Sequence, residues 1–337
     1  MKGVNTFLNG SNRLVALSSL KNDYYGVQKY QKWKFSKIRA NLLTYHSTIR
    51  AGSLRAAFVS DLHARFEEFI KAEPADMEKI ITDFQVRGYN ALLHNGTKAT
   101  PFGNKIAELL NYDGFRNSTK GIWFGTQLNV KACLYCNAQY TLTLDKRKKA
   151  LYQFDHYYSK KKYPYFSISM FNLVPACANC NTTKTSKEFR IATHAHPYIH
   201  DLNQLLEFDL DDTDVLNFIM SGKNAAHIKI TVKNRVGIAA GTADQLRGTN
   251  HMTIFTLEDI YRLFGDVGEE IFLKAYYYTD QRKKELKDVF DAAGVQTAFT
   301  DSMMGRFILG NYTLNDEINK RPLSKMTKDI AEKLNLL

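Results

Sequence analysis

The sequence contains no long run of apolar residues. No stretch approaches the ~18 consecutive apolar residues that a membrane-spanning helix needs. The first residues, M-K-G-V-N-T-F-L-N-G-S-N, lack the apolar segment and small-residue cleavage site of a secretory signal. No internal repeat or low-complexity tract stands out. The sequence therefore predicts a cytoplasmic protein without a membrane partner.

Cysteine is scarce, with 4 residues in a chain of 337. They form two C-x-x-C pairs, Cys133 with Cys136 and Cys177 with Cys180. Without an export signal, such pairs favour thiolate metal binding over disulfides, although four unrelated buried or redox thiols are the alternative. Two C-x-x-C turns complete a tetrahedral Zn²⁺ site. Because four thiolates leave no open coordination position, the expected zinc is structural.

Acidic residues are too few to balance the basic ones. The chain has 34 Asp and Glu against 46 Lys and Arg, which gives a formal net charge of +12. This excess suits a polyanionic partner such as nucleic acid, but a generally basic protein without such a partner fits equally well. The 19 Tyr and 21 Phe permit stacking on bases, although most of them are expected in the core.

The expected fold class is α+β, divided into three ranges. Apolar periodicity predicts helices through most of residues 13–95, and a cluster of turn residues marks a boundary near 95–105. We therefore expect a helical N-terminal region over 1–105, a core with the motifs over 106–200, and a mixed, mainly helical region over 201–337. The expected strands are 139–144, 150–154 and 227–233, and the expected later helices are a short one after Pro175, then 257–264, 269–290 and 326–337.

A candidate catalytic group lies between the two cysteine pairs. Asp155 and His156 end an expected strand, and they offer a carboxylate for a hard cation and an imidazole for proton abstraction near neutral pH. Asn181 follows the last cysteine and offers a neutral oxygen ligand. Since Mg²⁺ takes one or two protein oxygens plus waters and phosphate oxygens, this sparse pair is adequate.

The chain resembles the HNH endonucleases of the ββα-metal type. D-H at 155–156, N-L-V-P at 172–175 and C-N-x-x-K at 180–184 match that family's motif in order and spacing. The resemblance implies a zinc-bound ββα-metal nuclease core within the α+β fold. It covers roughly residues 109–337, because segments 111–116, 309–312 and 320–325 look like features of one bacterial HNH group.

The resemblance also implies a role for each matching residue. His156 would activate the attacking water, and Asp155 with Asn181 would bind one divalent ion, Mg²⁺ or Mn²⁺, against the scissile phosphate. Asn172 would brace the loop so that the base points correctly. Asn181 stands where the family often has His, which leaves the identity of the metal open.

Lysines next to the motif are candidate phosphate contacts. They are Lys184 and the run Lys160, Lys161 and Lys162. A solvated lysine after a helix fits Lys184 equally well. The expected function is DNA hydrolysis in bacterial phage defence or a mobile element, with a targeting or activating partner such as an ATPase docking on residues 1–108. The alternatives are a non-catalytic zinc module that binds nucleic acid or protein, and an HNH nuclease that cleaves RNA.

Overall fold

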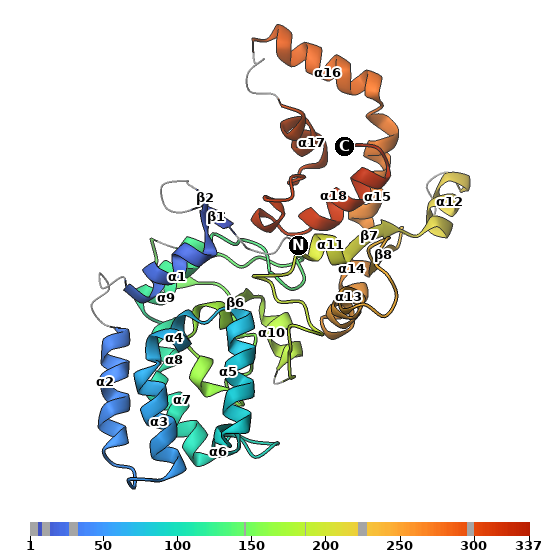
Figure 1. Cartoon of the computed structure of the whole chain (residues 1–337). Helices are drawn as coiled ribbons and strands as arrows, with labels where there is room; N and C mark the ends of the chain where they lie inside the picture. Colours follow the sequence, from blue (N-terminus) through green and yellow to red (C-terminus); the bar gives the residue numbers. More distant parts are fainter. Residues whose placement is uncertain are drawn as a thin grey trace. The chain divides into compact units, whose positions relative to one another are not determined.

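The computed structural model describes residues 6–8, 14–26, 33–144, 146–185, 187–221, 228–294 and 300–337 (Figure 1). The chain packs as two compact units that alternate along the sequence. The N-terminal unit takes the described parts of residues 3–130 and 141–199, and the C-terminal unit takes those of residues 131–140 and 200–337. The three expected ranges stay a prediction about separate functional domains.

Helices predominate among the described residues, with short strands in two-stranded sheets, so the expected α+β class is confirmed. The helices of the N-terminal unit before the cysteine motif are α1 (Leu17–Gly26), α2 (Phe35–His46), α3 (Leu54–Ala64), α4 (Phe66–Lys71), α5 (Pro74–Val86), α6 (Tyr89–Leu93), α7 (Pro101–Leu110), α8 (Tyr112–Arg116) and α9 (Thr119–Leu128). The predicted helical stretch 13–95 is confirmed in its described part, apart from the strand β2 (Leu14–Ala16), which pairs with β1 (Thr6–Leu8).

Local sequence signals set the starts of these helices. The Ser53 hydroxyl accepts a hydrogen bond from the backbone N–H of Ala56 at the start of α3, and Thr100 caps α7 in the same way through Gly103. Such caps satisfy amide groups that have no partner inside the helix. Helix α5 begins at Pro74, as the sequence predicts, since proline fits the first helical position.

Aromatic rings form the core of the N-terminal unit. Phe84 is fully buried, and its ring centroid lies 5.6 Å from that of Phe58, 5.1 Å from Tyr89 and 4.9 Å from Tyr165. Tyr165 comes from the loop that precedes the second half of the motif, in the short helix η1 (Pro164–Phe166). The helical region and the motif region therefore share one core.

Hydrogen bonds also attach the helices to this loop. The Tyr24 hydroxyl donates to the carbonyl of Ile168 at 3.0 Å, and the Ser169 hydroxyl donates to the carbonyl of Phe69 at 2.6 Å. The Tyr165 hydroxyl donates to Asn90 Oδ1 at 3.1 Å. These contacts fix the loop on both sides of Ser167.

The strands of the motif region differ from the expected hairpin. Thr143–Leu144 (β3) pairs with Lys149–Ala150 (β4), whereas Gln153–His156 (β5) pairs with Leu173–Ala176 (β6), and both pairs are antiparallel. The predicted first strand was 139–144, but Tyr140 pairs with Ala132 and Gln139 accepts a backbone hydrogen bond from Cys133. Residues 139 and 140, at the start of the expected strand, therefore pair with the turn that carries Cys133 instead of forming a hairpin. Residue 145 of the expected turn lies outside the described residues.

The C-terminal unit contains one sheet and several helices. Strands β7 (Leu206–Leu210) and β8 (Ile230–Asn234) are antiparallel. The predicted strand 227–233 is thus found from residue 230, and residue 227 lies outside the described residues. The helices are α11 (Leu202–Leu205), α12 (Asp212–Met220), α13 (Ala243–Ile254), α14 (Leu257–Arg262), α15 (Gly265–Tyr277), α16 (Asp280–Ala292), α17 (Asp301–Leu309), η3 (Ile318–Lys320) and α18 (Ser324–Lys333).

One expected helix of this unit is divided. Residues 269–290 were predicted as a single helix, but α15 ends at Tyr277 and α16 begins at Asp280. The Thr279 hydroxyl accepts a hydrogen bond from the backbone N–H of Arg282 and so caps α16. The expected helices at 257–264 and 326–337 correspond to α14 and α18. Within the described ranges, no helix has both the length and the apolar character to cross a membrane.

The aromatic core gives a test of this packing. We expect Phe84→Ala to lower the free energy of unfolding by about 3–5 kcal/mol, because it opens a cavity among the rings of Phe58, Phe69, Tyr89 and Tyr165. Val86→Ala is the matched control on the same helix, since Val86 is 83% exposed and its loss should change stability by less than about 0.5 kcal/mol. Urea unfolding of both variants measures the difference, and equal midpoints would contradict this core.

Candidate functional site

The motif residues lie on a strand, a second strand and a helix. Asp155 and His156 end β5, where they pair in register with Val174 and Leu173 of β6. Helix α10 (Ala178–Lys184) begins two residues after β6 and supplies Asn181. The short antiparallel pair with α10 therefore brings together residues that are 25 or more positions apart in sequence.

Asp155, His156 and Asn181 line one cleft of about 380 Å³ in the N-terminal unit. Lys160 and Lys161 line the same cleft. Its remaining walls come from α8, β5 and α10, through Tyr112, Asp113, Arg116, Gln153, Phe154, Ser159, Thr182 and Thr185. The cleft thus combines oxygen ligands, an imidazole and cationic side chains.

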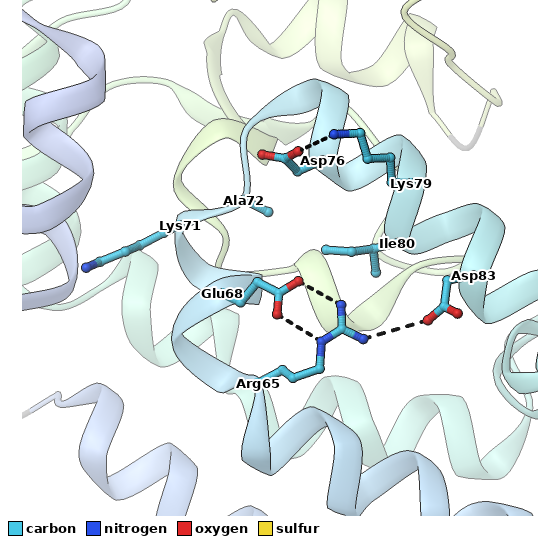
Figure 2. A pocket seen from close by; sticks show the side chains of 8 residues that line it. All are labelled: Arg65, Glu68, Lys71, Ala72, Asp76, Lys79, Ile80 and Asp83. Atoms are coloured by element: carbon cyan, nitrogen blue, oxygen red, sulfur yellow. Dashed lines mark hydrogen bonds and ion pairs between the residues drawn. The ribbon is translucent and has the colours of Figure 1, made fainter.

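A larger cavity of about 500 Å³ lies between α4 and α5 and differs in its charges (Figure 2). Its charged side chains neutralise one another: Arg65 pairs with Glu68, and Lys79 pairs with Asp76 at 3.0 Å. A cavity whose charges are already paired has little left to offer an ionic ligand. The cleft at Asp155 is therefore the stronger candidate.

The backbone holds the His156 ring in one orientation. Its Nε2 lies 2.9 Å from the carbonyl oxygen of Ser167, and because a carbonyl can only accept, Nε2 carries the proton in this contact. The Tyr112 ring packs edge-on against the imidazole, with centroids 4.4 Å apart. Nδ1 is then the nitrogen with a lone pair, and it has no hydrogen-bond partner among the residues that the structure describes.

His156 is uncharged at neutral pH. The pKa of His156 is lowered to about 3, mainly by burial and also by the positive charge of Lys160, while the hydrogen bond to Ser167 opposes the shift. A neutral imidazole with a free Nδ1 is the form that can accept a proton.

Asn172 closes the loop between β5 and β6. Its Oδ1 accepts a hydrogen bond from the backbone N–H of Tyr158 at 2.7 Å, and its Nδ2 donates to the carbonyls of Tyr158 at 3.1 Å and Phe166 at 2.9 Å. Asn172 is fully buried and does not line the cleft. These contacts are those of a residue that shapes the loop carrying Ser167.

The Asp155 carboxylate is paired with a buried lysine. Lys184 Nζ lies 3.1 Å from Asp155 Oδ2 and 2.5 Å from the carbonyl oxygen of His156. Burial lowers the pKa of Lys184, and the Asp155 carboxylate opposes that shift. The structure thus places Lys184 differently from the expected phosphate contact: its side chain is 0% exposed and holds the end of β5.

Asn181 and Asp155 are the oxygen donors available to a divalent ion. Asn181 Nδ2 donates to Gln153 Oε1, which fixes the amide through its nitrogen and leaves Oδ1 as the donor to a cation. Both side chains line the cleft, and oxygen donors match Mg²⁺ or Mn²⁺. The two oxygen donors therefore fit a hard divalent ion. The Asp155 carboxylate also forms an ion pair with Lys184.

The three lysines of the 160–162 run have different surroundings. Lys160 Nζ lies 4.7 Å from the centroid of the Tyr112 ring. Lys161 is exposed and also lines the cleft, whereas Lys162 pairs with Glu188 outside it. The structure brings Lys160 and Lys161 to the candidate site and leaves Lys162 away from it.

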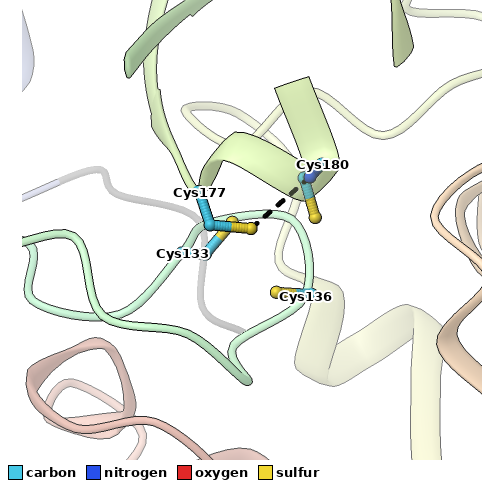
Figure 3. A group of neighbouring side chains, drawn as sticks. All are labelled: Cys133, Cys136, Cys177 and Cys180. Atoms are coloured by element: carbon cyan, nitrogen blue, oxygen red, sulfur yellow. Dashed lines mark hydrogen bonds between the residues drawn. The ribbon is translucent and has the colours of Figure 1, made fainter. Parts of the chain in front are cut away.

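The four cysteines form a group that could hold a metal ion. The Sγ atoms of Cys133, Cys136, Cys177 and Cys180 all lie within 4.8 Å of one another, and all four residues are buried (Figure 3). Sulfurs that share one tetrahedral Zn²⁺ are about 3.8 Å apart. The expected four-thiolate group is therefore confirmed as a candidate metal site, compatible with structural zinc.

Backbone amides support the thiolates. The N–H of Cys180 donates to Cys177 Sγ at 3.5 Å, and the N–H of Ala138 donates to Cys136 Sγ at 3.4 Å. Such N–H to sulfur contacts favour the charged thiolate that a metal requires.

Residues of the C-terminal unit hold the first cysteine turn. The Tyr135 ring stacks on that of Phe255 at 4.3 Å, and the carbonyl of Tyr135 lies 2.7 Å from His251 Nε2. The Tyr261 hydroxyl donates to the carbonyl of Cys136 at 2.7 Å. The long segment after the motif is therefore part of what shapes this turn.

Several residues of the site were not assigned roles from the sequence. His156 is contacted by the backbone carbonyl of Ser167 and by the ring of Tyr112, and Asn181 is contacted by the side-chain amide of Gln153. No sequence motif identifies residues that make contacts of this kind. The segment 111–116, which carries part of the sequence resemblance, contains α8, and α8 forms a wall of the cleft. Comparisons with protein-family models, with curated proteins and with solved structures found no match.

The Asp155–Lys184 pair gives a stability test. We expect Lys184→Met to lower the free energy of unfolding by about 3–5 kcal/mol, because it leaves the buried carboxylate without its cation. Lys187→Met is the matched control, since Lys187 is exposed three residues further on. Thermal unfolding of the two variants measures the effect, and equal melting temperatures would show that Asp155 does not depend on Lys184.

The cysteine group gives a test by metal analysis. We expect about one zinc ion per chain from four thiolates, and its loss in Cys180→Ser together with a lower melting temperature. Asn179→Ala, an exposed position between the paired cysteines, should keep the zinc. A purified chain that carries no zinc, or a Cys180→Ser variant that keeps it, would contradict the four-thiolate site.

Proposed function

We propose that this chain is a metal-dependent endonuclease of the HNH type that hydrolyses phosphodiester bonds in DNA. The observation that carries the proposal is the shared cleft, where a neutral imidazole and two oxygen donors meet. The order β5, β6, α10 with the motif residues at its ends supports a ββα-metal core. In this proposal the cysteine group holds a structural zinc ion and takes no part in the chemistry.

His156 is the general base of the proposed reaction. Its neutral Nδ1 accepts a proton from water, and the resulting hydroxide attacks phosphorus in line while the 3′-oxygen leaves. The Ser167 carbonyl keeps the proton on Nε2, so that the lone pair stays on Nδ1. Asn172 holds the loop that carries this carbonyl and thereby orients the base.

Asp155 and Asn181 would hold the divalent ion, Mg²⁺ or Mn²⁺. When bound, such an ion supplies positive charge that offsets the charge on the phosphorane and on the leaving oxygen. Lys184 keeps the Asp155 carboxylate in place from inside the protein. Lys160 and Lys161 add positive charge to the wall of the cleft, which favours a phosphate backbone there.

The biological setting rests on the sequence resemblance alone. It favours a cytoplasmic effector of bacterial phage defence or of a mobile element, with a partner protein, such as an ATPase, that supplies targeting or activation. Residues 1–108 are the segment proposed to dock that partner.

A non-catalytic zinc module is the second candidate, and one observation favours it. Asp155 is already paired with Lys184, and the Asn181 amide is already bonded to Gln153. These contacts are what purely structural side chains would make. Such a module would bind nucleic acid or protein but would not nick plasmid DNA with Mg²⁺ or Mn²⁺.

The proposed base gives the decisive test of function. We expect the wild-type chain to nick supercoiled plasmid when Mg²⁺ or Mn²⁺ is added, and His156→Ala to be slower by about 10²–10⁴-fold, because a positioned general base contributes that much. DNA binding by His156→Ala should stay at the wild-type level, as measured by fluorescence anisotropy.

Two controls make this result specific. His46→Ala replaces a histidine on α2 that does not line the cleft and should cut normally. A parallel digest of tRNA separates DNA from RNA as the substrate. A wild-type chain that cuts neither nucleic acid with either ion would exclude the nuclease, and full activity in His156→Ala would exclude this base.

A further inference from the structure

Helix α8 forms a wall of the candidate cleft, and the proposed chemistry does not use its charged residue. Arg116 ends this helix, lines the cleft and is partly exposed. Among the residues that the structure describes, Arg116 makes no ion pair and no hydrogen bond through its side chain. Asp113, on the same helix and also in the cleft, does not pair with it.

This free charge distinguishes Arg116 from the other arginines near a cavity. Arg65, in the cavity between α4 and α5, forms ion pairs with Glu68 and Asp83 (Figure 2). A guanidinium that lines a cleft without a carboxylate partner keeps its five donors for a ligand. Guanidinium groups bind phosphate oxygens in pairs, which lysine ammonium groups do not do.

The helix that carries Arg116 is held rigidly against β5. The Tyr112 hydroxyl donates to the carbonyl of Phe154 at 3.0 Å, and Phe115 is fully buried. Asn111 Oδ1 accepts a hydrogen bond from the N–H of Gly114 at 3.1 Å. A side chain at residue 114 would clash with Asn111, since its Cβ would lie 2.4 Å from Nδ2. Arg116 is therefore presented from a fixed position relative to His156.

The positive charges of the cleft come from two elements. Arg116 ends α8, whereas Lys160 and Lys161 lie in the loop after β5. Lys160 also lies over the Tyr112 ring, which connects the two elements through Tyr112. This distribution suits a chain of phosphates that passes through the cleft better than one isolated anion.

We propose that Arg116 binds a backbone phosphate of the substrate strand, next to the scissile phosphate that the water activated by His156 attacks. This inference rests on the proposed nuclease function and deepens it, because it assigns a second phosphate subsite to the cleft. Arg116 contacts substrate through two of its three guanidinium nitrogens, and Lys161 supplies weaker, non-directional charge beside it.

The test measures DNA binding separately from cleavage. A labelled DNA duplex is titrated with the full-length chain in the His156→Ala background, without added Mg²⁺, over a series of KCl concentrations. We expect Arg116→Gln to raise the dissociation constant about tenfold and to reduce the slope of its logarithm against log salt by about 0.9, the value for one lost phosphate contact. Arg116→Lys should restore the slope but only part of the affinity.

Arg50→Ala is the matched control, since Arg50 is an exposed arginine of the same unit that does not line the cleft. It should leave affinity and slope unchanged. Because the Arg116 side chain makes no ion pair or hydrogen bond with any residue that the structure describes, melting temperatures of the Arg116 variants should equal that of the parent.

The outcomes separate this inference from the function on which it rests. If the wild-type chain cuts DNA and Arg116→Gln binds with the same constant and slope as Arg50→Ala, the subsite is excluded and the nuclease stands. If the wild-type chain neither binds nor cuts DNA or RNA, both proposals fail. If only RNA is cut, the same titration with RNA decides the subsite.

Discussion

The loop between β5 and β6 is the feature on which the candidate site depends, and the Asn172 amide holds that loop. Three hydrogen bonds from one buried side chain satisfy backbone groups of Tyr158 and Phe166. Removing the amide would leave buried polar groups unpaired, at about 1–3 kcal/mol for each. The Ser167 carbonyl belongs to this loop, so the orientation of His156 follows from the same constraint.

The ionisable side chains at the end of β5 are buried, and each is either paired or uncharged. Lys184 is fully buried and neutralises Asp155, while burial keeps His156 uncharged. Isolated ions are costly inside a protein, whereas a bonded pair and a neutral ring are not. The end of β5 therefore holds a compensated pair, whereas Arg116 and Lys161, which form no ion pair within the described part of the chain, line the cleft.

The sequence predicted the members of the site better than their contacts. The spacing of the cysteines and the D-H dipeptide predicted a thiolate group and a shared location for Asp155, His156 and Asn181, because motif residues carry distinctive chemistry. His156 contacts the carbonyl of Ser167 and the ring of Tyr112, and Asp155 pairs with the buried Lys184. Such contacts depend on tertiary packing, so Lys184 was expected at a phosphate and lies in the core. The strand pairing of residues 153–156 was likewise missed, since a local hairpin pattern cannot reveal a partner strand 20 residues away.

The N-terminal helices belong to the same physical unit as the cleft. Phe84 and Phe58 pack on Tyr165. Hydrogen bonds also connect Tyr24, Phe69 and Asn90 to residues on either side of Ser167. A change in these helices would therefore reach the His156 ring through the loop that carries Ser167. This coupling gives the segment proposed to dock a partner a direct physical route to the base: a partner that tightens or loosens the loop would change how well the Ser167 carbonyl holds the imidazole.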